Sequence, residues 1–379
     1  MARSAAKRVR RFGRTVAGVV LGGAGLVAGG AAAVVAAEKL LVARMRGRQD
    51  PEIGEGFGTL RGTPCTVVTD DGVPLHVEVD GPEDAPVTIV FCHGYALDQD
   101  CWHYQRRDLT GIGRRVFYDQ RSHGRSRRGR PADSTIDQLG ADLHRIIEAT
   151  VPPGGPIVLF GHSMGGMSIL ALAQQHPELF RGRVRAVALI ATSGRLNQVT
   201  LGLPAFLGRA VDAAAEPVMR TLAWQPAIVD QGRRVGAELS FLTSRMLGFG
   251  AGEVSPALVD HLDEMIRRTP TDVLTEFWPA LSDHDKQEAY AVLRDVPTLV
   301  VCGDRDRMTP IEHSEHIAAA LPDADFVRVP DAGHMVMMER PAVVNEALRT
   351  LLARAGVRET PPAPSAGGGT PPTIDAASP

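Results

Sequence analysis

The chain has few cysteines and almost no net charge. These two features argue against a disulfide-rich protein, a zinc protein and a nucleic-acid-binding protein. Four cysteines in 379 residues are too few for a disulfide framework, and their spacing is unlike that of a zinc site: Cys65, Cys92, Cys101 and Cys302. The formal net charge is −3, from 41 basic and 44 acidic residues, so no overall positive field would gather nucleic acid. We therefore expect a small-molecule substrate, no metal site and no nucleic-acid partner.

Charged residues are also absent from one long stretch near the amino terminus. Residues 15–37, TVAGVVLGGAGLVAGGAAAVVAA, follow a basic block that contains six Arg and Lys residues. As a helix this stretch would reach about 34 Å, enough to cross a bilayer core of about 30 Å. We expect residues 1–50 to hold a membrane anchor, with the catalytic domain outside the cytoplasm. A cleaved signal peptide ending near Ala37 is the alternative.

The two ends of the chain differ in composition from the middle. Residues 356–379 have almost nothing to bury and are rich in Pro, Gly and Ala, which is typical of a disordered tail. For the whole chain, 44% hydrophobic and 22% charged residues indicate a sizeable packed core. We assign this core to residues 63–193 and 293–355, with an insert at 194–292 between its two parts.

The central region alternates short apolar runs with helical patterns. Two alternating runs around Asp71 and Gly72 predict a β-hairpin. Five continuous apolar runs follow, of the kind buried on both faces: VTIVFCHG, RRVFYDQ, PIVLFGHS, VRAVALIAT and VPTLVVCGD. A helix is expected over 134–150, with Ser134 and Asp137 as its capping box. The alternation predicts an α/β fold with a mostly parallel sheet and helices on both faces.

One of these strands runs into the sequence IVLFGHSMGG, residues 157–166, in which a turn and then a helix follow. The pattern G-x-S-x-G in this setting is typical of a nucleophile elbow, where the serine takes a strained backbone conformation above the sheet. We expect Gly161 and Gly165 to remove side chains that would collide with Ser163. The start of a helix behind the serine also favours developing negative charge.

With these motifs in this order, the chain resembles the α/β-hydrolase superfamily, in its serine-nucleophile, esterase- or lipase-like branch, over residues 63–355. Five segments carry the resemblance: HGY at 93–95, DQRSHGRS at 119–126, GHSMGG at 161–166, GDRDRMTP at 303–310 and DAGHMVMMERP at 331–341. The resemblance implies an eight-stranded α/β-hydrolase sheet. It also implies that the insert at 194–292 forms a helical cap over the active site.

The resemblance further implies the catalytic residues. Ser163 would be the nucleophile, Asp306 the acid and His334 the base, and this chain order is the one expected for the fold. The backbone N–H groups of Tyr95 and Met164 would form the oxyanion hole. In such a triad the imidazole takes the proton of the serine hydroxyl, and the carboxylate orients the imidazole.

Neighbouring residues offer rival interpretations. Asp304 lies two residues before Asp306 and competes with it for the role of the acid. His93 and His162 lie beside the oxyanion loop and the nucleophile, where a histidine usually braces the structure. The basic run at 121–130 is more typical of a solvated loop than of an anion site.

A serine nucleophile indicates hydrolysis through an acyl-enzyme. We expect an enzyme without a cofactor that cleaves small to medium acyl esters or monoacylglycerol-like esters, with substrate choice set by apolar insert residues such as Trp224 and Trp278. Carbon–carbon bond hydrolysis and cofactor-free haloperoxidase-like chemistry use the same residues and stay open. A membrane-anchored binding protein without turnover is the alternative from another class. The sequence does not indicate an oligomeric state.

Overall fold

The computed structural model describes residues 39–40, 42–47, 50–196, 237–250 and 252–357. The expected membrane segment at 15–37, the tail beyond residue 357 and Trp224 of the insert lie outside these described residues. Among the helices of the described ranges, none is both long enough and apolar enough to cross a membrane.

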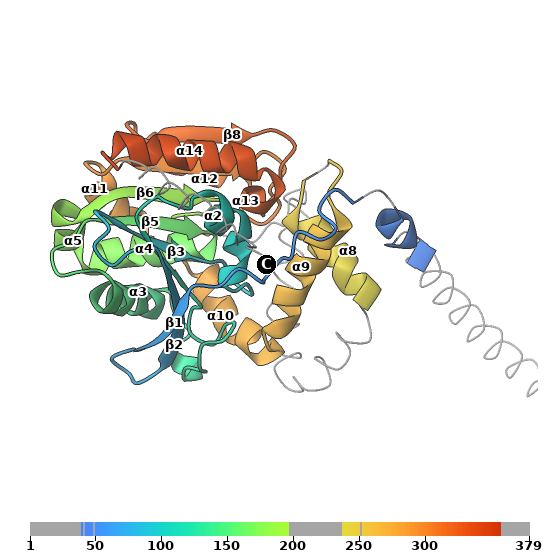
Figure 1. Cartoon of the computed structure of the whole chain (residues 1–379), viewed down its shortest axis with the longest axis horizontal. Helices are drawn as coiled ribbons and strands as arrows, with labels where there is room; N and C mark the ends of the chain where they lie inside the picture. Colours follow the sequence, from blue (N-terminus) through green and yellow to red (C-terminus); the bar gives the residue numbers. More distant parts are fainter. Residues whose placement is uncertain (1–38, 41, 48–49, 197–236, 251, 358–379) are drawn as a thin grey trace, which may run out of the picture.

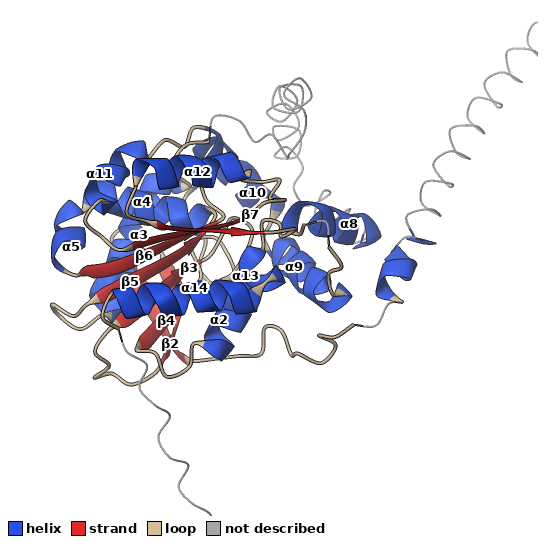
Figure 2. Ribbon diagram, turned by 90° about the horizontal axis from the view of Figure 1, so that it is seen from above, coloured by secondary structure: helices blue, strands red, loops and turns tan. Residues whose placement is uncertain are grey.

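An eight-stranded sheet runs through the centre of the molecule (Figures 1 and 2). Its strands are β1 (Thr63–Val68), β2 (Pro74–Asp80), β3 (Thr88–Cys92), β4 (Arg114–Tyr118), β5 (Ile157–His162), β6 (Val184–Ile190), β7 (Thr298–Gly303) and β8 (Asp325–Val329). Their spatial order is β1-β2-β4-β3-β5-β6-β7-β8. β2 pairs antiparallel with both β1 and β4, and all other neighbours are parallel. The predicted hairpin and the mostly parallel α/β fold are confirmed.

Helices cover both faces of this sheet, as Figure 2 shows from above. One face packs against α3 (Ile136–Thr150), α4 (Met164–Gln175), α5 (Pro177–Gly182), α11 (Tyr290–Leu293) and α12 (Ile311–Ala320). The other packs against α2 (His103–Asp108), α13 (Val336–Glu339) and α14 (Pro341–Arg354). Because the inner strands are covered on both sides, every residue of β3, β5 and β7 is buried. This explains why these strands read as continuous apolar runs.

Between β6 and β7 the described chain forms three longer helices: α8 (Ala237–Gly248), α9 (Pro256–Arg268) and α10 (Thr271–Ser282). They lie beside one end of the sheet in Figure 1. Val273 and Phe277 of α10 are buried against Met164 and Met167 at the start of α4. The insert is therefore helical where it is described, and part of its apolar surface packs onto the core. Its role as a cap stays a prediction.

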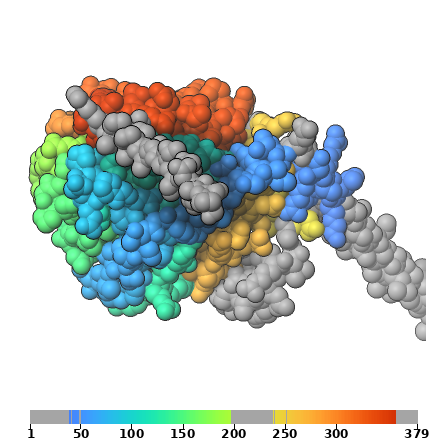
Figure 3. All heavy atoms as spheres, in the orientation of Figure 1, coloured from blue at the N-terminus to red at the C-terminus, as the bar shows by residue number. Residues whose placement is uncertain are grey.

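The segment before β1 joins the core to the insert. Asp50 accepts hydrogen bonds from the hydroxyl of Ser255 (2.5 Å) and from the N–H of Ala257 (2.9 Å), at the start of α9. The hydroxyl of Tyr104 in α2 donates to Glu52 at 2.7 Å. In Figure 3 the atoms of this segment cover the surface where the core and the insert meet. Residues 50–62 thus belong structurally to the folded part of the protein.

The start of α3 differs from the prediction by one residue. Thr135, not Ser134, is the N-cap, because its hydroxyl accepts from the N–H of Gln138 at 3.1 Å. Ser134 instead closes the preceding turn, where its N–H donates to the carbonyl of Pro131 at 3.2 Å. Serine and threonine both serve as N-caps, so adjacent candidates leave the exact helix start open in the sequence.

Candidate active site

Ser163 connects β5 to α4 at the carboxyl end of the sheet. Its φ of 52° and ψ of −120° form a backbone conformation that residues with a side chain rarely adopt. Its N–H donates to the carbonyl of Ile190 at 2.9 Å, and its carbonyl accepts from the hydroxyl of Thr192 at 2.7 Å. These bonds to the end of β6 hold the strained turn in place and leave Ser163 partly exposed.

The glycines beside Ser163 are required by backbone packing. A Cβ atom on Gly161 would lie 2.7 Å from the carbonyl oxygen of Gly165, and one on Gly165 would overlap the carbonyl of Cys92 at the end of β3. We expected side chains here to collide with Ser163; the atoms nearest to the added Cβ positions belong instead to the start of α4 and to the end of β3. Glycine is needed because the start of α4 lies directly against the ends of two strands.

Asp306 and His334 are hydrogen bonded to each other. His334 Nδ1 lies 2.8 Å from Asp306 Oδ2, and both side chains are largely buried. Asp306 Oδ1 accepts the N–H groups of Met308 (2.8 Å) and Thr309 (2.9 Å), so the loop after β7 orients the carboxylate. Because the carboxylate accepts the Nδ1 proton, Nε2 of the neutral imidazole is left without a proton and can act as a base.

The competing carboxylate, Asp304, has different partners. Its Oδ1 accepts the N–H of Asp331 at 2.7 Å, and its Oδ2 lies 3.5 Å from Arg328. Asp304 therefore stabilises the turn that leads to His334. The structure places Asp306, not Asp304, against the imidazole.

A contact through His162 joins the turn of Ser163 to the turn of His334. Nε2 of His162 lies 3.0 Å from the backbone carbonyl of His334, and the centroids of the two rings are 4.8 Å apart. Within the part of the chain that the structure describes, the hydroxyl of Ser163 makes no hydrogen bond. In enzymes without substrate such bonds are often long or poorly aligned. The three sequence-predicted residues thus lie on adjoining turns, with the pair of His334 and Asp306 already formed.

The segment His93 to Tyr95 lies next to Ser163. A Cβ atom built on Gly94 would be 3.2 Å from the Cβ of Ser163, so the loop passes the serine as closely as a glycine allows. Met164 is the first residue of α4, and the N–H of such a residue has no acceptor inside its helix. The two backbone donors expected for an oxyanion hole therefore belong to segments that flank Ser163.

Gln120 holds this loop in place, and its role was not predicted from the sequence. Its side-chain amide donates to the carbonyl of His93 at 2.5 Å, and its backbone N–H donates to Nε2 of His93 at 2.8 Å. The hydroxyl of Ser168 in α4 donates to the Gln120 amide oxygen at 3.0 Å. One glutamine thus ties the loop at 93 to the helix behind Ser163. Nothing in the sequence pattern signals such a contact, because it joins three distant segments.

His93 and His162 have bracing roles. Burial is the main cause that lowers the pKa of His93 to about 3 and the pKa of His162 well below its usual value. His93 uses both ring nitrogens, since Nδ1 lies 2.8 Å from the carbonyl of Gly94 and Nε2 accepts from Gln120. Burial thus favours the neutral form of both rings, which fits a bracing role.

The turn at 119–126 is fixed by buried charges. Both oxygens of Asp119 accept backbone N–H groups at 2.8 Å, from Gln99 and Arg125. Arg121 is fully buried and pairs with Asp142 at 2.6 Å and with Asp71 at 3.0 Å. The expectation of a solvated loop is therefore wrong for Arg121, because two carboxylates compensate its buried charge.

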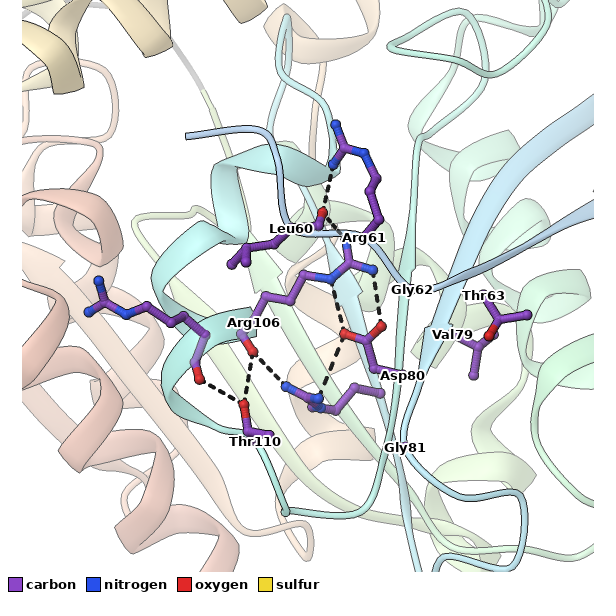
Figure 4. A pocket seen from close by; sticks show the side chains of 11 residues that line it. Leu60, Arg61, Gly62, Thr63, Val79, Asp80, Gly81, Arg106 and Thr110 are labelled. Atoms are coloured by element: carbon purple, nitrogen blue, oxygen red, sulfur yellow. Dashed lines mark hydrogen bonds and ion pairs between the residues drawn. The ribbon is translucent and has the colours of Figure 1, made fainter. Parts of the chain in front are cut away.

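A cavity of about 560 Å³ lies elsewhere, at the amino-terminal end of β4 (Figure 4). Four arginines and one acid line it: Arg61, Arg106, Arg107, Arg115 and Asp80. Asp80 accepts from Arg106 at 3.0 and 3.2 Å, as the dashed lines in Figure 4 mark. The cavity is at the opposite end of the parallel strands from Ser163, so it is separate from the candidate active site. Among the described residues, no three His, Cys, Asp or Glu side chains are grouped as metal ligands.

Known proteins similar to this chain include enzymes of several kinds. The dihydrolipoyllysine-residue acetyltransferase component of an acetoin cleaving system from Pseudomonas putida is 28% identical over 281 residues, covering 73% of this chain and 66% of that protein. The structure of an enol-lactonase from Burkholderia xenovorans is 25% identical, with a TM-score of 0.58 and coverage of 76% and 100% of the two chains. A thermophilic esterase from Thermogutta terrifontis, 24% identical with a TM-score of 0.60 over 77% and 98%, shares the fold.

A family model covers most of the described core. The model described as alpha/beta hydrolase fold matches residues 87–341, from the start of β3 to the start of α14. The matched range includes the elbow after β5, the loop after β3 and the two turns that meet at His334. With this sheet order and this match, the chain belongs to the alpha/beta hydrolase family.

Proposed function

We propose that this protein is a serine hydrolase that cleaves carboxylic esters through an acyl-enzyme, with Ser163 as nucleophile, His334 as base and Asp306 as acid. The observation that carries the proposal is the 2.8 Å bond between His334 Nδ1 and Asp306 Oδ2, next to a serine at φ 52°. A serine hydroxyl is a weak nucleophile at neutral pH, and such a pair is what activates it.

The proposed reaction has two halves. Ser163 Oγ attacks the ester carbonyl carbon while its proton passes to Nε2 of His334, and the resulting tetrahedral intermediate expels the alcohol, which takes that proton. Water then attacks the acyl-enzyme, gives its proton to the same nitrogen, and the acid leaves as Ser163 recovers its hydrogen. Asp306 stabilises the imidazolium in both halves by accepting the Nδ1 hydrogen bond.

We assign the oxyanion hole to the backbone N–H groups of Tyr95 and Met164. Gly94 passes next to Ser163, and Met164 begins a helix whose N-terminus favours negative charge. By precedent each such donor contributes about 2.7–4 kcal/mol to transition-state stabilisation. Loss of either donor would therefore slow the reaction by about 10²- to 10³-fold.

Lactones are the second candidate class of substrate. The enol-lactonase from Burkholderia xenovorans supports this choice, and a lactone is a cyclic ester that undergoes the same acyl-enzyme steps. Carbon–carbon bond hydrolysis and haloperoxidase-like chemistry remain alternatives with the same residues. Attachment to a membrane through residues 15–37 is a further proposal from the sequence, and extraction of membranes with alkaline carbonate tests it.

A fluorophosphonate probe tests the central proposal. We expect the full-length protein to be labelled, Ser163→Ala to lose the label, and Ser255→Ala to keep it, because Ser255 is also a serine at a helix start. A series of p-nitrophenyl esters of graded chain length, together with a lactone, then identifies the substrate class. If the wild type takes no label and hydrolyses no ester, a binding protein without turnover is the better interpretation.

A further inference from the structure

The turn that carries Tyr95 is bound to the insert by its side chain and backbone. The hydroxyl of Tyr95 donates to the carbonyl of Leu274 in α10 at 2.6 Å. The next residue, Ala96, accepts a hydrogen bond from the hydroxyl of Thr269 at the end of α9, at 3.2 Å. Two successive residues of the loop beside Ser163 are thus bonded to the junction between α9 and α10.

A contact between Asp98 and Arg268 extends the same connection. Asp98 Oδ2 lies 3.3 Å from the guanidinium of Arg268, the last residue of α9. The other carboxylate oxygen of Asp98 accepts the N–H of Asp100 at 3.0 Å and caps the short helix that follows. The loop is therefore held by residues 268–274 at three points, none of which lies in the sheet.

The backbone at Ala96 is strained. Its φ is +62°, and the turn is closed by a 3.3 Å bond from the N–H of Leu97 to the carbonyl of Gly94. Glycine or asparagine is the usual residue where a tight turn needs a positive φ, so alanine here costs free energy. Such a conformation persists when surrounding contacts over-determine it, and the bonds to Thr269 and Leu274 are contacts of that kind.

The other side of the loop is held by the core. Gln120 bonds both the ring and the carbonyl of His93, and Gly94 lies against Ser163. The peptide N–H of Tyr95 therefore lies between an anchor in the core and an anchor in the insert. Its position relative to Ser163 depends on both anchors, so a shift of the insert would move the N–H.

We infer that Tyr95, through its hydroxyl, and Thr269 are positioning residues. They couple the position of the insert to the position of the Tyr95 N–H, the proposed oxyanion donor. The inference rests on the proposed function, because it gives the N–H of Tyr95 a role in ester hydrolysis. The coupling acts on the transition state: a donor displaced by a fraction of an ångström still allows the substrate to bind but stabilises the developing oxyanion less. Loss of the contact should therefore lower kcat more than it raises KM.

Tyr95→Phe and Thr269→Val test the coupling, since each removes a hydroxyl and keeps the shape of the side chain. Tyr104→Phe is the matched control, because its hydroxyl makes a bond of similar length, 2.7 Å, to Glu52 away from the site. For each variant we would measure kcat and KM on one p-nitrophenyl ester, the inhibition constant of a trifluoromethyl ketone, which forms an oxyanion on Ser163, and the melting temperature.

We expect Tyr95→Phe to lower kcat by about 10-fold, to weaken the ketone by a similar factor and to change KM by less than about 3-fold. The double variant with Thr269→Val should be little worse than either single variant, because both bonds hold one unit. Wild-type kcat and ketone inhibition in Tyr95→Phe would overturn the inference, as would an equal loss in Tyr104→Phe. Ester turnover that survives in Ser163→Ala would instead overturn the proposed function.

Discussion

Replacing Asp306 by asparagine should abolish most activity because the two carboxylate oxygens have different partners. Oδ1 accepts the backbone N–H groups of Met308 and Thr309 at 2.8 and 2.9 Å. Oδ2 accepts the hydroxyl of Thr309 at 2.9 Å and lies 2.8 Å from His334 Nδ1. An asparagine offers an oxygen at one of these two places and an NH₂ group at the other.

The backbone donors decide which way the asparagine turns. With its oxygen at the Oδ1 place it keeps both N–H bonds, and its NH₂ group faces His334. The flipped amide would leave the buried N–H of Thr309 and the partly buried N–H of Met308 without an acceptor, at about 1–3 kcal/mol for the buried one and less for the other. An NH₂ group facing Nδ1 selects the imidazole tautomer with its proton on Nε2, which cannot accept the proton of Ser163. A preference of about 3 kcal/mol for this orientation of the asparagine alone lowers the population of the imidazole tautomer that can accept the serine proton by roughly 10²-fold. The loss of the carboxylate charge brings the expected fall in kcat to about 10⁴-fold.

Asp304→Asn is the matched control for this variant. Its oxygens contact the N–H of Asp331 and the side chain of Arg328, away from the imidazole, so kcat should stay within about 3-fold of wild type. Both variants would be assayed on the same p-nitrophenyl ester, with a thermal melt to check the fold. If Asp306→Asn keeps more than about a tenth of the wild-type kcat, or if Asp304→Asn is the inactive variant, the reasoning fails.

Three further outcomes follow from the structure. Gly165→Ala should lower the free energy of unfolding by more than about 2 kcal/mol in urea denaturation, because its Cβ would overlap the end of β3. Gly182→Ala is the control: its Cβ would meet open space, so its free energy of unfolding should stay within about 0.5 kcal/mol of wild type, and equal stability of the two variants would contradict the packing argument. Burial and the neighbouring carboxylates raise the pKa of Asp98 to about 7, so the folded state holds a proton that the unfolded chain has lost, and stability should fall between about pH 4 and pH 7, by up to about 1.4 kcal/mol per unit. In thermal melts across this pH range, the stability of Asp98→Asn should depend less on pH than that of the wild type, and an unchanged pH dependence would refute the assignment. Ser163→Ala and His334→Ala should each lower kcat by about 10⁴ to 10⁶, with the double variant little worse, while additive losses would show that the two residues do not act together.

The strands of this fold are predictable from the sequence for a simple reason. A strand covered by helices on both faces is apolar at every position, and β3, β5 and β7 are therefore visible as continuous runs. The turn at Ser163 is predictable because its strained backbone and close packing require glycines at fixed positions. The close packing of the start of α4 against the end of β3 leaves glycines at fixed positions, and this pattern is visible in a single sequence.

Contacts between distant segments are not predictable in this way. Only the resemblance to a family favoured Asp306 over Asp304, because the direction in which the loop turns the carboxylate is set by two backbone N–H groups. Gln120 looks like any polar residue after a strand, yet it bonds the loop at His93. Such contacts depend on the tertiary packing of several elements, which the local periodicity of the sequence does not predict.

The buried histidines also matter for the electrostatics of the site. The ring of His162 is 4.8 Å from that of His334, and at an effective dielectric constant of about 20 two unit charges at this separation repel by about 3 kcal/mol. A protonated His162 would thus oppose the imidazolium that His334 must form during the proposed reaction. Burial keeps His162 neutral by lowering its pKa, and it keeps His93 neutral for the same reason. In the proposed reaction, the positive charge that forms on His334 would therefore face the Asp306 carboxylate without a competing cation on His162.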